Sequence, residues 1–443
     1  MTPEDLLVPN LGPRTLHSPL QLSAVDGDGL GKFVPDATRV PYQIERMAGA
    51  SPADELCFEK AGPRQHIFFN PATTRAAIVT CGGLCPGINN VIRAVYVELH
   101  FNYRVKDVLG IRFGYQGLNP AVGQPPVRLT VDMVDNIHKH GGTVLGSSRG
   151  PEEPGVVVDF LQRENVQILF CVGGDGTQRG AHQIAAEARR RGARLAIVGI
   201  PKTIDNDLPM VWRSFGFATA LEKAREVLDI AHVEAKGAPN GIGLVKLMGR
   251  DAGFIAAGAT LASQEVNFTL IPEVPFPLTG PQGFLETLQR RILDRQHAVI
   301  VVAEGAGQDL IARDHVETDA SGNRKLHDVG PFLKERITAH FCDCGIPVNL
   351  KYMDPSYILR GVPANSDDAL LCNSMARQAV HAAMAGKTDV LIGSWHNTFL
   401  HVPIAAVTAI NKRVSPESEL WQGVLEATGQ PRWRQGAIQA RNI

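Results

Sequence analysis

The sequence lacks the features that mark membrane, secreted and nucleic-acid-binding proteins. It contains no apolar run of the roughly 18 residues that a membrane-spanning helix needs. Its first ten residues, MTPEDLLVPN, lack the basic and apolar regions of a secretory signal. The formal net charge of -1 gives no excess of positive charge for a nucleic acid. We therefore expect a cytoplasmic protein with no membrane and no nucleic-acid partner.

Cysteine is also scarce, with seven residues scattered through apolar or turn segments. The closest pairs are Cys81 with Cys85 and Cys342 with Cys344, and neither has the two-residue gap and partner pair of a zinc ribbon. The odd number argues against a disulfide framework. We expect reduced, structural thiols, in agreement with a cytoplasmic compartment.

What the sequence does have is enough length and apolar content for more than one core. It has 443 residues, of which 44% are hydrophobic, and single cores stop growing at roughly 250 to 300 residues. Prolines punctuate residues 1–75, with few periodic segments between them. We expect an irregular N-terminal extension over this range, followed by two domains.

From residue 75 onward, short apolar runs alternate with amphipathic helical patterns, which is typical of α/β folds with parallel sheets covered on both faces. The pattern therefore predicts two Rossmann-like three-layer domains with mainly parallel sheets. Strands are expected at Arg75 to Thr80, Val105 to Ile111, Ile168 to Val172, Leu195 to Ile200, Gly241 to Leu247, Phe268 to Ile271, Ala298 to Ala303 and Asp389 to Gly393. Helices are expected at Ile88 to His100, Val131 to Lys139, Gly155 to Glu164, Gln178 to Arg191, Phe217 to Ala235, Asp251 to Ala262, Gly280 to Asp294, Val329 to Phe341, Ser366 to Ala385 and Glu417 to Ala427.

The segment IVGIPKTIDNDL is the strongest candidate for a chemical centre. Pro201 cannot continue a strand ladder, so the strand is expected to end at Ile200 and to deliver Lys202, Thr203, Asp205 and Asp207 at its carboxyl end. There, one carboxylate can accept the proton of an attacking hydroxyl, and the lysine can offer a positive charge to a phosphoryl group. In an extended turn the two aspartates would share one side and Ile204 the other. The alternative is an Asx-turn that only caps the local backbone.

Two earlier strand ends carry glycine-rich turns. In the first, Gly82 and Gly83 let backbone N–H groups approach an anion closely. In the second, GGDGT at residues 173–177, Asp175 can hold Mg²⁺ while neighbouring amides cradle phosphates. The second turn lacks the ending of a Walker A loop. GGDGT also occurs in NAD kinases and lipid kinases, and Asp175 could instead be a simple helix cap.

Taken together, seven motifs in this order resemble the 6-phosphofructokinase family. The likeness runs from about Ala76 to His401 and is closest to the ATP-dependent branch of trypanosomatids and plants, which is itself similar to pyrophosphate-dependent enzymes. The motifs are GGLCPGINNVIR, LGSSRG, VGGDGTQRGA, PKTIDNDL, KLMGRDAGFIA, VAEGAGQD and KYMDPSYILR.

The resemblance implies transfer of the γ-phosphoryl group of Mg-ATP to the 1-hydroxyl of fructose 6-phosphate, with Asp205 as the base and Lys202, Thr203, Asp207 and Arg250 as further catalytic residues. It implies that residues 76–212 with 360–412 form the nucleotide domain, and that residues 213–359 with 413–443 form the sugar-phosphate domain. Asp175 would hold Mg²⁺. The implied nucleotide-binding residues are Gly83, Arg149, Gly150, Gly174, Asp175, Gly176 and Thr177. The implied sugar-binding residues are Thr203, Ile204, Asp205, Met248, Gly249, Arg250, Glu304, Lys351, Tyr357 and Arg360.

The identity of the phosphoryl donor depends on Gly176. Pyrophosphate-using relatives typically carry an aspartate there, whose carboxylate would repel the nucleotide's α-phosphate, so glycine favours ATP. Pyrophosphate remains the alternative donor, because Lys202 is shared with pyrophosphate users. Two other possibilities are an NAD kinase and a catalytically dead paralogue. By resemblance, the protein is also expected to be a homotetramer or a homodimer.

Overall fold

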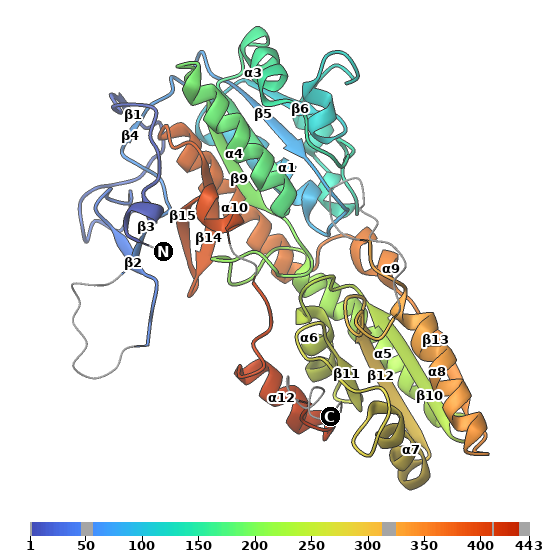
Figure 1. Cartoon of the computed structure of the whole chain (residues 1–443). Coiled ribbons are helices and arrows are strands. Elements are labelled where there is room, and N and C mark those ends of the chain that lie inside the picture. The colour runs from blue at the N-terminus through green and yellow to red at the C-terminus, as the bar shows by residue number, and fades with distance from the viewer. Residues whose placement is uncertain (1, 46–55, 312–324, 410–411, 434–443) are drawn as a thin grey trace. The chain divides into compact units, whose positions relative to one another are not determined.

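The computed structural model describes residues 2–45, 56–311, 325–409 and 412–433 (Figure 1). The chain forms two compact units, each built from several stretches of sequence. The first comprises Met1–Thr203, Leu208–Gly216 and Gly361–Asn411, and the second comprises Ile204–Asp207, Phe217–Arg360 and Lys412–Ile443. The predicted division into an extension and two domains with the limits given above stays a prediction.

The first unit is organised around a nine-stranded sheet. Its strands lie in the order β2 (Arg39–Pro41), β3 (Cys57–Lys60), β15 (Thr398–Pro403), β14 (Val390–Trp395), β9 (Ala196–Pro201), β8 (Ile168–Gly173), β5 (Arg75–Thr80), β6 (Asp107–Ile111) and β7 (Val127–Arg128). The five strands from β14 to β6 are parallel to their neighbours, and antiparallel strands extend both edges. Every residue of β8 and β9 is buried, so helices and loops cover both faces.

Two groups of helices pack on this sheet. One group contains α3 (Pro154–Arg163), α4 (Asp175–Arg190) and α11 (Ile404–Thr408), and Figure 1 shows α3 and α4 side by side. The other contains α1 (Ile88–Val97) and α10 (Ser366–Met384). Because α4 and α10 both contact β9, this strand lies under both groups.

The second unit is a smaller layered α/β structure. Its four-stranded parallel sheet has the order β11 (Phe268–Leu270), β12 (His297–Ala303), β10 (Gly241–Leu247) and β13 (Asn349–Met353). Alternate residues of β10 and β12, such as Ile242 and Ile300, join a core with α7 (Phe284–Arg295) and α8 (Val329–Asp343). On the opposite face, a β-carbon added to Gly243 would lie 2.9 Å from the Ala231 carbonyl oxygen of α5 (Phe217–Lys236). The remaining helices are α6 (Phe254–Ser263), α9 (Ser356–Gly361) and α12 (Glu419–Thr428). The predicted α/β class with mainly parallel sheets is confirmed.

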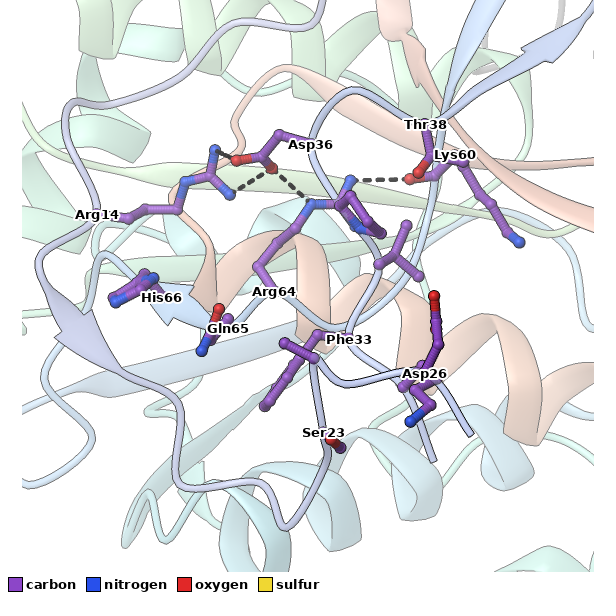
Figure 2. A pocket seen from close by; sticks show the side chains of 14 residues that line it. Arg14, Ser23, Asp26, Phe33, Asp36, Thr38, Lys60, Arg64, Gln65 and His66 are labelled. Carbon is purple, nitrogen blue, oxygen red and sulfur yellow. Dashed lines mark hydrogen bonds and ion pairs between the residues drawn. The ribbon is translucent and has the colours of Figure 1, made fainter. Parts of the chain in front are cut away.

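The N-terminal extension is more ordered than the sequence predicts. Strand β3 pairs with β15 and β2, and β1 (Leu16–His17) pairs with β4 (His66–Ile67). Arg14 and Arg64 donate hydrogen bonds to Asp36 (Figure 2), and these three residues line a hollow of about 730 Å³.

A buried ion network fastens this extension to the sheet. The Glu59 carboxylate of β3 accepts hydrogen bonds from Arg64 at 2.8 Å and from Lys387 at 2.6 Å, and it lies 3.1 Å from Nδ1 of His401. Burial opposes the charge on Glu59, but His401 and Lys387 outweigh it and hold the pKa of this carboxyl well below its usual range. The network could not be predicted from the sequence, because Lys387 and His401 lie more than 300 positions from Glu59.

Some predicted elements need correction. The helix expected over residues 131–139 is broken into α2 (Val131–Val134) and a 3-10 turn (Ile137–Lys139), because Asn136 leaves the helical conformation and donates to Asp135. The helix expected from Gly280 starts at Phe284, since Gly280 has a positive φ of 103° and turns the chain. The helix expected to run to His100 ends as α1 at Val97 and continues as a π-helical turn, Glu98–Asn102. Among the described residues, no helix is both long and apolar enough to cross a membrane.

Candidate functional site

In the first unit, the three strand ends singled out in the sequence lie side by side. Strands β9, β8 and β5 are consecutive in the sheet, with Gly173 opposite Pro201 and Val172 opposite Thr80. The turns that follow these strands therefore share one edge of the sheet, where ligands of open α/β sheets bind. The expectation that the third strand stops before Pro201 is wrong. Proline is its last residue, and the N–H of the next residue, Lys202, donates to the Gly173 carbonyl of β8.

Lys202 links all three turns. Its backbone N–H donates to the Gly173 carbonyl at 3.1 Å, and its ammonium donates to the Gly83 carbonyl at 2.6 Å. Only 5% of Lys202 is exposed. The structure thus places a positive charge among the glycine turns, as an anion site requires.

The segment around Arg149 lies against the first glycine turn. The Gly82 N–H donates to the Ser148 carbonyl at 2.9 Å, and the Ser147 hydroxyl donates to the Gly82 carbonyl at 2.6 Å. Arg149, which is exposed, and Gly150, with a φ of 111°, follow directly. Neither serine was expected in the site from the sequence, although both belong to the LGSSRG motif.

The second glycine turn is the beginning of helix α4. The helix starts at Asp175, three residues before the predicted start at Gln178, so Asp175, Gly176 and Thr177 form its first turn. The N–H groups of a first helical turn have no partner within the helix and favour anions. The Thr177 carbonyl accepts a hydrogen bond from Tyr115 at 2.7 Å, which fixes this turn from below. Tyr115 is a third residue that was not expected from the sequence.

Asp175 is a suitable ligand for Mg²⁺. Burial raises the pKa of its carboxyl, and the ion pair with Arg179 opposes this rise. Mg²⁺ commonly takes one or two protein carboxylates together with substrate phosphates. Among the described residues there is no cluster of three or more histidine, cysteine or acidic side chains, and a lone carboxylate beside an anion site fits this mode of binding.

The chain crosses between the units within the PKTIDNDL segment, since Lys202 and Thr203 belong to the first unit and Ile204–Asp207 to the second. In the first unit, Ser214 donates to the Thr203 carbonyl at 2.6 Å. In the second, Ile204 is buried, whereas Asp205 and Asp207 are only partly buried. Asn206 has a left-handed φ of 55°, so the predicted extended turn bends at this residue. Asparagine tolerates that conformation better than most residues.

In the second unit, two further strand ends come together. Met248, Gly249 and Arg250 follow β10, and Glu304 follows its neighbour β12. The Glu304 N–H donates to the Leu247 carbonyl at 2.9 Å, and the Gly305 N–H donates to the Gly249 carbonyl at 3.2 Å. A β-carbon at residue 305 would lie 1.8 Å from the Arg250 carbonyl oxygen, so only glycine allows the two loops to approach this closely.

The charges around Glu304 make a mixed polar site. Burial raises the pKa of this carboxyl, and the charges of Arg250, Lys246 and Arg360 oppose the rise. Lys246 forms ion pairs with Asp354 at 2.8 Å and with Asp328 at 3.0 Å. Neither Lys246 nor Asp354 was expected in the site, although both stand inside the motifs KLMGRDAGFIA and KYMDPSYILR.

The KYMDPSYILR segment divides between a strand and a helix. Tyr357 and Arg360 lie one turn apart in α9, with the guanidinium carbon 5.0 Å from the ring centroid. Tyr357 is 78% exposed. Lys351 instead lies in the middle of β13, opposite Gly243, and is exposed. The structure therefore brings Tyr357 and Arg360 together and places Lys351 earlier along the segment.

Comparison with known proteins agrees with this arrangement. The family model described as phosphofructokinase matches residues 75–383. The chain is 46% identical over 434 residues to an ATP-dependent 6-phosphofructokinase of Borreliella burgdorferi, covering 96% of this chain and 97% of the relative. It is 47% identical over 380 residues to an ATP-dependent 6-phosphofructokinase of Trypanosoma brucei brucei, covering 84% of this chain and 76% of the relative.

Solved structures show the same fold. The crystal structure of a pyrophosphate-dependent phosphofructokinase from Marinobacter aquaeolei matches with a TM-score of 0.66 at 21% identity, covering 82% of this chain and 92% of that one. At this identity the likeness concerns the fold alone. The family model and the close relatives go further: the chain belongs to the phosphofructokinase family.

Proposed function

We propose that this protein is an ATP-dependent 6-phosphofructokinase, which transfers the γ-phosphoryl group of Mg-ATP to the 1-hydroxyl of fructose 6-phosphate. The observation that carries the proposal is the convergence of the three glycine and lysine turns on Lys202, which joins Gly83 and Gly173. The close relatives named as ATP-dependent 6-phosphofructokinases support the choice of donor and acceptor. A homo-oligomeric state and a cytoplasmic location are part of the same proposal.

In this proposal the first unit binds the nucleotide. The backbone N–H groups of Gly174, Asp175 and Gly176 at the start of α4 would face the phosphates, with Thr177 beside them, and Gly83, Arg149 and Gly150 would line the other side. Asp175 would hold Mg²⁺, which would neutralise charge on the transferring phosphate. The ammonium of Lys202 would add a positive charge fixed by its bond to Gly83.

The second unit would bind the sugar phosphate. Met248, Gly249 and Arg250 would contact the sugar, and Glu304 would accept hydrogen bonds from its hydroxyls. Arg360 and Lys351 would provide positive charge for the 6-phosphate, with Tyr357 beside Arg360. The raised pKa of Glu304 is expected to fall when a ligand donates hydrogen bonds to its carboxylate.

Chemistry would centre on the PKTIDND turn. Asp205 would accept the proton of the 1-hydroxyl while the oxygen forms its bond to the γ-phosphorus. The bond between the γ-phosphorus and the bridging oxygen breaks, and ADP leaves with that oxygen. Thr203 and Ile204 would contact the sugar, and Lys202 and Arg250 would stabilise the charge on the transferred group. Asp207 would keep the turn in place.

The variant Asp205→Asn tests this assignment. We expect kcat to fall by about 100-fold to 10,000-fold with KM for fructose 6-phosphate little changed, because proton removal belongs to the transition state. Initial rates of ADP and fructose 1,6-bisphosphate formation would measure this. The matched control is Asp309→Asn, a carboxylate in the same unit outside the site. A near-normal kcat for Asp205→Asn would mean that another group is the base.

A further inference from the structure

A short segment of the second unit, Lys412 to Val414, fastens two parts of the proposed sugar site to one another. Its Lys412 N–H donates to the Asp207 carbonyl at 3.2 Å. Its Val414 N–H donates to Glu273 Oε1 at 2.8 Å, and the same carboxylate accepts the Gly253 N–H at 3.0 and 3.1 Å. Gly253 caps α6, directly after the Met248 to Arg250 turn. The segment therefore joins the catalytic turn to the loop that carries Arg250.

The side chain of Lys412 lies in the same junction. Its ammonium is 5.1 Å from the ring centroid of Phe254, the first residue of α6. A cation over an aromatic face is attracted by the ring, and the attraction grows as water is removed. Burial lowers the pKa of Lys412 to about 8, and the charge of Asp207 opposes the fall. The lysine is thus a cation held near Asp207 at neutral pH.

We propose that Lys412 is a positioning residue for phosphoryl transfer, which acts through Asp207 by balancing its charge and holding the PKTIDND turn beside the Arg250 loop. Two carboxylates two residues apart would otherwise favour protonation of one of them, and a protonated Asp205 cannot act as a base. This inference rests on the proposed function.

The charged groups around Lys412 determine the pH range over which this lysine carries the positive charge that balances Asp207. Lys412 is charged below about pH 8 and neutral above it. Asp207 is the acidic group that acts on it, while Glu273 is engaged by two backbone N–H groups. Burial raises the pKa of the Glu273 carboxyl, and its hydrogen bonds from the Gly253 and Val414 N–H groups and the charge of Arg413 oppose that rise. We therefore expect kcat to decline as pH rises through about 8.

The test compares pH profiles of kcat and KM from pH 6 to 10 for four proteins: wild type, Lys412→Arg, Lys412→Met and the control Lys334→Met. Lys334 is an exposed lysine of α8 in the same unit. At pH 7, Lys412→Met should lose about 10-fold in kcat, because small misplacements of reacting groups are costly. Its kcat should also lack the decline near pH 8 that is expected of wild type. Lys412→Arg should keep most of the activity and shift the limb to higher pH, since arginine stays charged. Lys334→Met should match wild type.

A purely structural role would give a different result. Removing one partner of a largely buried charge pair leaves the other uncompensated, so Lys412→Met should unfold at a lower temperature than wild type in either case. A purely structural role would leave the alkaline limb of kcat near pH 8 in place in Lys412→Met, whereas the positioning role removes it. The inference is overturned if Lys412→Met keeps wild-type kcat at pH 7, or if wild type and Lys412→Arg share the same alkaline limb. No turnover in wild type would count against the proposed function itself. Should Lys412→Met not fold, the arginine comparison still decides.

Discussion

At the scale of single residues, Gly176 offers the sharpest test of donor choice. A β-carbon at this position would meet no heavy atom within 4 Å, so a larger side chain can be added without distorting the first turn of α4. We expect Gly176→Asp to fold and to lose about 100-fold or more in kcat/KM for ATP, because a carboxylate beside the nucleotide phosphates costs several kcal/mol. Steady-state rates at varied ATP would measure the loss.

The matched control is Gly176→Ala, which adds bulk without charge and should keep most of the ATP turnover. Equal loss in both variants would point to crowding rather than charge. Unchanged ATP turnover in Gly176→Asp would refute the argument for this position. Circular dichroism of both variants would verify that α4 is retained.

Single residues also show which parts of the candidate site could be predicted from the sequence and which could not. The glycines, Lys202 and Asp175 could be selected because each follows an apolar run, and the structure brings the three turns to one sheet edge. Tyr115, Ser147 and Lys246 could not, because their contacts depend on strand order and register rather than on local pattern. The roles of all these residues in binding and catalysis remain proposals.

At the scale of elements, the ion network around Glu59 that joins the N-terminal extension to the sheet leads to a prediction about stability. Glu59→Gln removes the only charge that β3 contributes to the Arg64 and Lys387 cluster, and these cations are 2% and 4% exposed. Arg64 keeps its ion pair with Asp36, but the buried Lys387 loses its carboxylate, which should lower the free energy of unfolding by about 3 kcal/mol. Urea denaturation of the purified protein would measure it.

Asp28→Asn is the control for this experiment, since Asp28 pairs with Lys32 on the surface of the same extension. An exposed pair of this kind contributes little to stability, so Asp28→Asn should unfold at nearly the same urea concentration as wild type. If Glu59→Gln were as stable as wild type, the network would not hold the extension to the sheet.

Helices and strands were predicted most accurately where burial imposes a regular pattern of apolar residues on the sequence. Strands β5, β8 and β9 are buried along most or all of their length, and their apolar runs predicted them to within a residue or two. Strands β13 and β15 were not predicted from the sequence, because partial exposure mixes polar residues into short segments such as NLKYM. Polar residues likewise interrupted the helix expected at 131–139, where Asn136 competes for local hydrogen bonds.

At the scale of the whole molecule, the alternation of strands and helices predicted the α/β class, and the motifs predicted the family that the comparisons show. Neither could reveal that the PKTIDND segment divides between two units, or that Lys412 returns from the C-terminal part of the chain to donate to Asp207. Such links join residues about 200 positions apart in sequence, and only the assembled fold brings them together.

The central claim is that the protein phosphorylates fructose 6-phosphate from Mg-ATP. The most direct measurement incubates the purified wild-type protein with Mg-ATP or Mg-pyrophosphate, crossed with fructose 6-phosphate or sedoheptulose 7-phosphate, and quantifies the products by phosphorus NMR. We predict equal amounts of ADP and fructose 1,6-bisphosphate from ATP and fructose 6-phosphate, at a rate far above every other combination. Turnover with pyrophosphate but not ATP, or no phosphorylation of fructose 6-phosphate, would contradict the account.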